Sequence, residues 1–207
     1  MTRSWVAVTA VTLAWVTLVG CSAAPKEQGD RMDLQTSADR TLQELKEADA
    51  SLDGVLDDSA GYAVFPTIGK GGLIIGGGYG RGALYEDGKV TGYTDMTQAA
   101  VGALIGGQSF TELVVFQTPE TLANFKKGNF SFGANASAIA LNKGAASATE
   151  FKDGVAIFTR PNQGLMADAS LNGQKFRYVP LEEAGDEQPG EANVAASRDE
   201  PATRPVD

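Results

Sequence analysis

The sequence contains no histidine, and its only cysteine is Cys21. Without histidine the chain lacks the usual general base at neutral pH, so Ser/His/Asp and Cys/His catalytic arrangements and imidazole metal ligands are excluded. A single cysteine also excludes an internal disulfide and a metal site built from several thiolates. These absences weigh against a hydrolase or a metalloprotein, and we predict a protein that is not an enzyme and holds no metal or cofactor.

Positive charge is also scarce, because 17 Lys and Arg residues stand against 26 Asp and Glu residues and give a net charge of -9. Affinity for nucleic acid comes mainly from basic side chains that neutralise phosphates, so nucleic acid is not an expected partner. What the chain does have is 43% hydrophobic residues over 207 positions. That content and length fit one globular domain of ordinary size with tails.

The first 21 residues have the pattern of an export signal. Arg3 gives a short positive region, and Trp5 to Val19 form an uncharged stretch about as long as the hydrophobic part of a signal peptide. A membrane-spanning helix needs roughly 20 apolar residues, so this stretch is short for a span. Leu18-Val19-Gly20-Cys21 resembles the bacterial lipobox, whose cysteine thiol accepts a diacylglyceryl group. We therefore predict a signal peptide over residues 1–20 and lipidation of Cys21, with palmitate-type acyl chains.

Lipidation at Cys21 would hold the mature chain at a membrane, because two or more acyl chains anchor stably where one is marginal. Ser22, in place of Asp, resembles the Gram-negative lipoproteins that are sorted to the outer membrane. Residues 21–30 are polar and include one proline, which is typical of a flexible tether. We expect a lipid-anchored protein of the cell envelope, in the outer membrane and facing the periplasm or the surface. The alternative is an ordinary signal peptide that ends near a buried cysteine.

Two helices are predicted beyond this tether. From Arg31 to Leu52 apolar residues recur every three or four positions, which predicts one amphipathic helix. Its polar side is not enriched in Lys or Arg, so packing against the domain is favoured over a membrane-surface helix. A short second helix is predicted after Thr118 as N-cap, with Pro119 as its first residue and Gly128 placed to end it.

The rest of the folded part is predicted to be β-structure. Asp87-Gly88, Asp153-Gly154 and Asn172-Gly173 each lie between β-like runs and indicate hairpins. The predicted strands are Tyr62–Phe65, Leu73–Tyr85, Lys89–Met96, Ala99–Gly106, Glu112–Gln117, Phe130–Ala140, Ala145–Phe151, Val155–Arg160, Leu165–Leu171 and Lys175–Val179. We predict an α+β fold with a mainly antiparallel curled sheet or barrel-like β core, an N-terminal amphipathic helix and one short inserted helix. The folded domain covers residues 31–180, and the acidic residues 181–207 are predicted to be a disordered tail.

Eight glycines fall between Gly69 and Gly82. Their spacing matches neither a phosphate-binding loop nor a dinucleotide-binding turn. Glycine within a strand lets the backbone bend or lie close to a neighbour, so we favour a structural role over contact with a ligand. Gly102, Gly106 and Gly107 predict a second bent strand.

Four segments, in this order, resemble the SYLF domain. They are Gly61–Pro66 (GYAVFP), the Gly69–Gly82 run, Gly107-Gln108 before Thr111–Phe116 (TELVVF), and Gly164–Gly173 (GLMADASLNG). The resemblance covers about residues 34–178. It implies a lipid-binding module without catalytic activity, which has a phosphoinositide preference in eukaryotic members and occurs as a lipoprotein in bacteria.

One segment departs from the eukaryotic pattern. Eukaryotic members have a basic Ser-Arg-Ser-Lys type segment before the Gly-Leu run, where this chain has Thr159-Arg160-Pro161-Asn162-Gln163. The arginine is kept and the lysine is lost. An acidic domain with a single cation at this place is expected to bind phosphoinositides poorly.

The sequence thus predicts a membrane-anchored lipoprotein whose SYLF-like domain binds lipid or an amphipathic ligand at the envelope. Candidate contacts to lipid head groups are Lys70, Arg81, Lys89, Lys126, Lys127 and Arg160, and the alternative for each is a solvated surface charge. A second hypothesis is a structural or protein-interaction module of the envelope without lipid-binding activity of its own. An enzymatic function would rest only on scattered carboxylates such as Asp95, Glu112 and Asp168.

Overall fold

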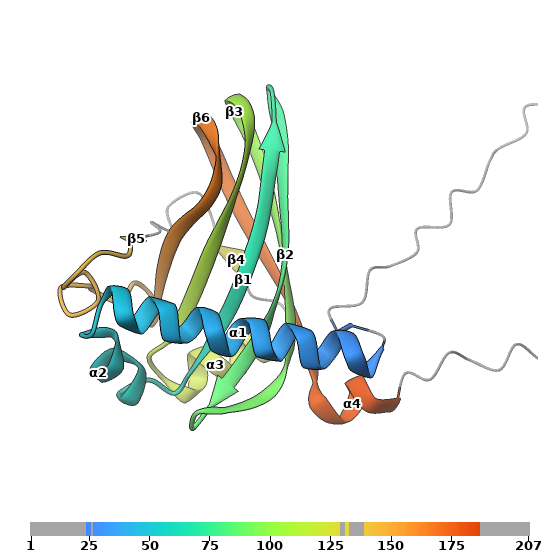
Figure 1. Cartoon of the computed structure of the whole chain (residues 1–207), viewed down its shortest axis with the longest axis vertical. Coiled ribbons are helices and arrows are strands. Elements are labelled where there is room, and N and C mark those ends of the chain that lie inside the picture. Colours follow the sequence, from blue (N-terminus) through green and yellow to red (C-terminus); the bar gives the residue numbers. More distant parts are fainter. Residues whose placement is uncertain (1–23, 26, 129–130, 133–138, 187–207) are drawn as a thin grey trace, which may run out of the picture.

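The computed structural model describes residues 24–25, 27–128, 131–132 and 139–186. The predicted signal peptide, Cys21 and residues 187–207 lie outside this part of the chain. The elements are α1 (Gln28–Ala48), α2 (Leu52–Asp57), β1 (Gly61–Gly72), β2 (Ile75–Glu86), β3 (Lys89–Phe116), α3 (Pro119–Lys126), β4 (Ser131–Phe132), β5 (Ile139–Ala140), β6 (Val155–Pro180) and α4 (Leu181–Asp186). The fold is α+β, and the helices gather at one end of a tall sheet (Figure 1).

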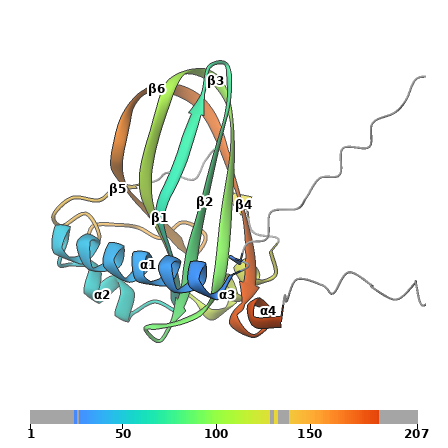
Figure 2. The same ribbon diagram turned by 45° about the vertical axis from the view of Figure 1, so that its right-hand side comes forward.

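The sheet is mainly antiparallel and curls because two of its strands are very long. The N-terminal half of β3 pairs with β2, and its C-terminal half pairs with β1. β6 pairs with β3 along both halves, so the two strands arch together around the β1–β2 hairpin (Figure 2). β4 and the parallel strand β5 add to β6 at opposite halves. Among the described residues no pairing joins β4 to β5, so the predicted curled sheet forms without closing into a barrel.

The two faces of the curled sheet have separate hydrophobic cores. Since successive strand residues point to opposite faces, Tyr62 and Val64 of β1 lie on one side and Ala63 and Phe65 on the other. The outer core packs the sheet against α1 and α2 and includes Leu45 and Leu52 from these helices, with Val64, Tyr85, Leu113, Val115 and Phe158 from the sheet. The inner core is aromatic and joins Phe125 of α3 to Phe65, Phe116 and Phe176 of the sheet.

The N-terminal helix differs from its prediction at both ends. It begins three residues earlier, inside the predicted tether, and ends at Ala48, after which α2 forms a separate turn. Asp49 leaves the helix with a φ of -144°. Its buried carboxylate accepts hydrogen bonds from the backbone N–H groups of Ser51, Gly144 and Ala146. A contact with residues 95 positions away therefore ends the helix, and the local apolar periodicity does not reveal it.

Two of the three predicted tight turns are confirmed. Asp87-Gly88 and Asp153-Gly154 have the positive φ angles that such turns need, 48° and 72° in the first and 51° and 77° in the second. The hairpin at Asn172-Gly173 is wrong, because these residues lie within β6 and pair with Ala100 and Ala99. The three strands predicted between Lys89 and Gln117 are likewise one continuous strand, β3.

Three further predictions need correction or lie partly outside the described residues. Residues 145–148 form turns and residues 149–151 are irregular, so the strand predicted at 145–151 is wrong; the Thr149 hydroxyl and amide donate to the carbonyls of Ala145 and Ala146. Of the strand predicted at 130–140, only 131–132 and 139–140 are described, as β4 and β5. The predicted disordered tail begins with six helical residues, α4, because Ala184 finds a buried place beside Tyr93.

The helix predicted after Thr118 is confirmed. The Thr118 hydroxyl accepts the N–H of Thr121, and Pro119 is the first residue of α3. Gly128 follows with a φ of 70°, which suits the end of a helix.

Candidate functional site

The glycine-rich segments come together at the end of the sheet away from the helices. We call this end the glycine arch and define it as residues 67–81 of the β1–β2 hairpin, 96–111 of β3 and 161–174 of β6. Gly71 pairs with Gly77 on one side and with Gly107 on the other, and Gly107 pairs with Leu165 of β6. The ribbon view shows these strands side by side above α1 (Figure 2).

Glycine is required by close packing at the foot of the arch, as the sequence predicted. A Cβ atom on Gly80 would lie 2.5 Å from Cγ1 of Ile68, and one on Gly82 would lie 2.4 Å from the carbonyl oxygen of Val64. Real Cβ atoms do not approach other atoms so closely. At these two positions the glycines let neighbouring strands pack, and no ligand is needed to explain them.

The arch contains very little charge. Lys70, Arg81 and Asp168 are the only charged residues in its three segments, which gives the arch a net charge of +1 in a chain of -9. Lys70 is buried, with 6% of its surface exposed. Arg81 is half-buried and donates from Nε to the hydroxyl of Tyr79 at 3.0 Å. The acidic residues of the chain are therefore concentrated elsewhere.

A polar layer lies inside the curl, where the aromatic inner core meets the arch. Nε2 of Gln174 donates to Oε2 of Glu112 at 2.9 Å, and both Glu112 and Gln98 are buried. Burial raises the pKa of Glu112 to about 7, and the hydrogen bond from Gln174 offsets only part of this effect. Among the described residues, Oε1 of Glu112 and Oε1 of Gln98 have no hydrogen-bond partner.

The carboxylates named as catalytic candidates are not brought together. Asp95 forms an ion pair with Arg177 at 2.5 Å and faces the side of β3 opposite to its neighbour Met96, which belongs to the inner core. Glu112 lies inside the curl with Gln174. The side chain of Asp168 lies outside what the structure describes. Within the described residues, no three of Asp, Glu, Cys and His are placed to hold a metal ion.

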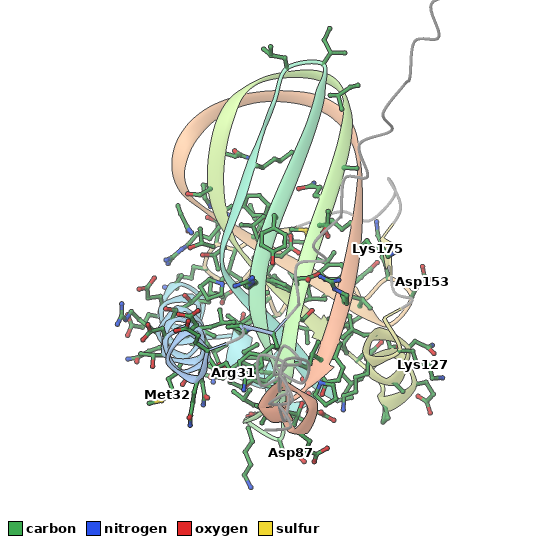
Figure 3. All side chains as sticks on the ribbon, turned by 90° about the vertical axis from the view of Figure 1, so that its right-hand side faces the viewer. Arg31, Met32, Asp87, Lys127, Asp153 and Lys175 are labelled. Carbon is green, nitrogen blue, oxygen red and sulfur yellow. The ribbon has the colours of Figure 1, made fainter. Side chains whose placement is uncertain are left out.

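The six predicted lipid contacts lie at three separate places. Lys70 and Arg81 belong to the β1–β2 hairpin, whereas Lys89, Lys126 and Lys127 lie at the helical end. Figure 3 shows Lys127 and Asp87 at this lower end, far from the top of the hairpin. Arg160 lies on β6 and is paired with Glu44 of α1, so the six cations do not form one cluster.

Lys126 and Arg160 are held by acidic partners. Nζ of Lys126 lies 2.5 Å from Oε1 of Glu86 and 5.9 Å from the centre of the Tyr178 ring. Arg160 pairs with Glu44 of α1 at 2.6 Å. Lys89 and Lys127 are exposed.

The tip of the β1–β2 hairpin is a feature that the sequence analysis did not single out. Leu73 and Ile74 connect the two strands and Ile75 begins β2, and the three side chains are 68%, 76% and 75% exposed. Their signal in the sequence is an apolar trio set between Gly71-Gly72 and Gly76-Gly77-Gly78. In the sequence, three consecutive apolar residues suggest a buried strand. The turn becomes evident only from the structure, where Gly72 and Gly76 form the last pair of β1 and β2.

Residues 97–179 match the model of the Ysc84 (SYLF) family, described as "Las17-binding protein actin regulator". The matched segment holds most of β3, α3 and nearly all of β6. The resemblance to the SYLF domain that the motifs indicated is therefore confirmed over residues 97–179.

One relative among curated proteins is Beta cell expansion factor A of Aeromonas veronii, which is 27% identical over 148 residues. The alignment covers 70% of this chain and 56% of that protein, so the chain spans little more than half of its relative. In the part of the chain that the structure describes, no helix is both long and apolar enough to cross a membrane.

Proposed function

We propose that this chain is a membrane-anchored bacterial lipoprotein whose SYLF domain binds lipid or another amphipathic ligand at the cell envelope. The export-signal pattern ending at Cys21 and the membership of the SYLF family support this proposal. The observation that carries it is the distribution of charge, since the glycine arch has a net charge of +1 while the chain has -9.

A surface that meets a bilayer has to avoid two costs. Charged side chains lose hydration in the hydrocarbon region, and acidic side chains are repelled by anionic head groups. The arch keeps both costs low, because it has only three charged residues, of which Asp168 is the only acid, and the β1–β2 hairpin has no acid between Thr67 and Tyr85. The helical end is unsuitable, because it carries acidic residues on α1 and α2 and at Asp87.

The six candidate cations are expected to have unequal roles in lipid binding. Arg81 lies on the arch and would meet a lipid phosphate, whereas Lys126 and Arg160 are already paired with Glu86 and Glu44. We therefore assign these two cations to contacts within the domain and not to lipid. We propose no catalytic role for any residue, and we assign the protein to the outer membrane on the basis of Ser22.

Vesicle flotation of the chain from residue 21 onward, with Cys21→Ser, tests lipid binding separately from acylation. All residues that the structure describes lie in this segment, and it has no thiol to acylate. We expect it to float with phosphatidylcholine vesicles and more strongly when phosphatidylglycerol is included. Failure to float with either kind of vesicle would remove lipid binding from the proposed function.

One observation favours a second function, a protein-interaction module of the envelope. The description of the matched family names a protein, Las17, as the ligand. Specific capture of an envelope protein by the same Cys21→Ser chain, without vesicle binding, would support this function instead.

A further inference from the structure

We propose that the hairpin tip formed by Leu73, Ile74 and Ile75 inserts into the hydrocarbon region of a bilayer and is the main membrane contact of the folded domain. This inference rests on the proposed lipid-binding function and adds the site and depth of contact. The three side chains follow one another at a turn and are at least 68% exposed. The three other large apolar side chains found exposed in the described residues, Met32, Tyr79 and Leu181, are each in a different place.

The backbone at the tip is built to enter an apolar medium. In hydrocarbon every backbone N–H and C=O group needs a partner within the protein. β1 pairs with β2 up to Gly72 and Gly76, and on their outer sides these strands pair with Gly106 and Ala100 of β3. Within the hairpin only Leu73 and Ile74 lie outside the ladders, so few of its backbone polar groups would lack a partner in lipid.

The residues below the tip follow the order expected for a membrane interface. The next pairs down the hairpin are Gly72 with Gly76, Gly71 with Gly77 and Lys70 with Gly78, so here Lys70 is the only residue of the hairpin that has a side chain. Tyr79, 40% exposed, and Arg81 come next, joined by their hydrogen bond. Tyrosine and arginine are residues that prefer the head-group region.

The spacing fits the thickness of one leaflet. Tyr79 follows Ile75 by four residues, which is about 13 Å along a strand. The hydrocarbon core of a bilayer is about 30 Å thick, or about 15 Å for each leaflet. With the Tyr79 hydroxyl and Arg81 at the head groups, the three apolar side chains would lie within a single leaflet.

Charge favours a bilayer over a second copy of the chain as the occupant. The hairpin between Thr67 and Tyr85 contains Lys70 and Arg81 and no acid, which complements anionic head groups. Two copies meeting tip to tip would bring these like charges together. Binding to a second copy is therefore an outcome of the test and not the proposal.

The test compares the Cys21→Ser chain with two variants of it in flotation with vesicles of phosphatidylcholine and phosphatidylglycerol. The first has Leu73→Ser, Ile74→Ser and Ile75→Ser. The control has Met32→Ser on α1, a residue that is 65% exposed, so both variants remove apolar surface without disturbing the core. We expect the tip variant to bind at least about tenfold more weakly, because the free energy gained by burying several large apolar side chains is larger than a tenfold change in affinity requires. The control should bind like the parent.

A spectroscopic readout reports the depth of insertion. Both tryptophans, Trp5 and Trp15, precede residue 21, so the tested chain contains none. In an Ile74→Trp variant, we expect vesicles to shift the emission to shorter wavelength and brominated acyl chains to quench it. A Met32→Trp variant should show neither effect.

Four outcomes are distinguishable. Weak binding of the tip variant together with quenching at residue 74 supports the inference. If the parent and the tip variant float equally, or if residue 74 is not quenched, the inference is overturned and lipid binding stands. If the parent floats with no vesicle, the proposed function fails and the inference fails with it. If the tip variant instead lowers the mass of an oligomer in sedimentation, the tip is a contact between copies and the inference is overturned.

Discussion

Gln174 of β6 donates a hydrogen bond of 2.9 Å to the Glu112 carboxylate of β3 inside the curled sheet. Glu112 is fully buried, and this burial raises its pKa to about 7 in the folded protein, from 4.5. The native state therefore binds a proton that the unfolded state releases. Its stabilising contribution is complete below about pH 4.5 and is lost as the pH rises through about 7.

Glu112→Gln is expected to remove this pH dependence. For the parent chain, the contribution of Glu112 to the free energy of unfolding should fall by on the order of 3 kcal/mol between pH 4.5 and pH 8. The variant lacks the titrating group, so its free energy of unfolding, measured in urea, should depend less steeply on pH over this range. The same pH dependence in parent and variant would mean that Glu112 titrates normally in the folded protein.

The contribution of Asp49 to stability has the opposite dependence on pH. Burial acts to raise its pKa, but hydrogen bonds from the Ala146 amide, the Ser51 side chain and the Gly144 and Ser51 amides outweigh it and lower the pKa to about 2. Its stabilising contribution is present above about pH 4 and is lost as the pH falls toward 2.

We expect Asp49→Ala to destabilise the fold by on the order of 3 kcal/mol at pH 7, because several backbone N–H groups lose their acceptor. Denaturant unfolding at pH 7 and pH 3 measures this effect, and the difference between parent and variant should be smaller at pH 3. The matched control is Asp53→Ala, because the Asp53 carboxylate forms only an exposed ion pair with Lys46. If Asp53→Ala lowers the free energy of unfolding as much as Asp49→Ala does, the hydrogen bonds to Asp49 are not what stabilises the fold.

The glycines of the β1–β2 hairpin should differ in their tolerance of a side chain. At Gly82 an added Cβ meets the Val64 carbonyl oxygen at 2.4 Å and Cδ1 of Phe65 at 2.8 Å, whereas at Gly69 it meets nothing within 4 Å. Gly82→Ala is expected to lower the free energy of unfolding by about 1–3 kcal/mol, as overpacking does. Gly69→Ala should change it little. Thermal unfolding of the two variants checks this, and equal melting temperatures would contradict close packing at Gly82.

The local features of this fold could be predicted from the sequence. Thr118 and Pro119 begin α3 through a hydroxyl cap and a fixed φ angle, and Asp87-Gly88 makes a turn whose conformation few other residues adopt. Such features depend on neighbours in the chain. The same holds for the structural role of Gly80 and Gly82, since a glycine run in a strand already indicates close packing.

The long-range features could not be predicted. Asn172-Gly173 is a strong local turn signal, but β3 offers its backbone a partner at every position, and the two residues remain in a strand. Asp49 ends α1 because it bonds to residues 144 and 146, which no local pattern reveals. The exposure of Leu73 to Ile75 was missed for the same reason, because it depends on where β1 and β2 begin to pair.

Arg81 and Lys127 form a matched pair for the electrostatic part of lipid binding. Arg81 lies on the glycine arch, and Lys127 lies exposed at the helical end. Since a basic residue near an anionic surface contributes about 1 kcal/mol, Arg81→Glu should weaken binding to phosphatidylglycerol vesicles about fivefold or more. Lys127→Glu should have less than about a twofold effect, because charges beyond a Debye length are screened. The reverse order of these effects in flotation would place the membrane contact at the helical end.

Attachment to a bilayer through Cys21 is tested most directly by the intact mass of the protein extracted from bacterial membranes. We expect a chain that lacks residues 1–20 and carries a diacylglyceryl group and an acyl chain on Cys21, with phospholipid retained under native conditions. A mass that includes the leader, or an unmodified Cys21 thiol, would contradict a lipoprotein held at the cell envelope.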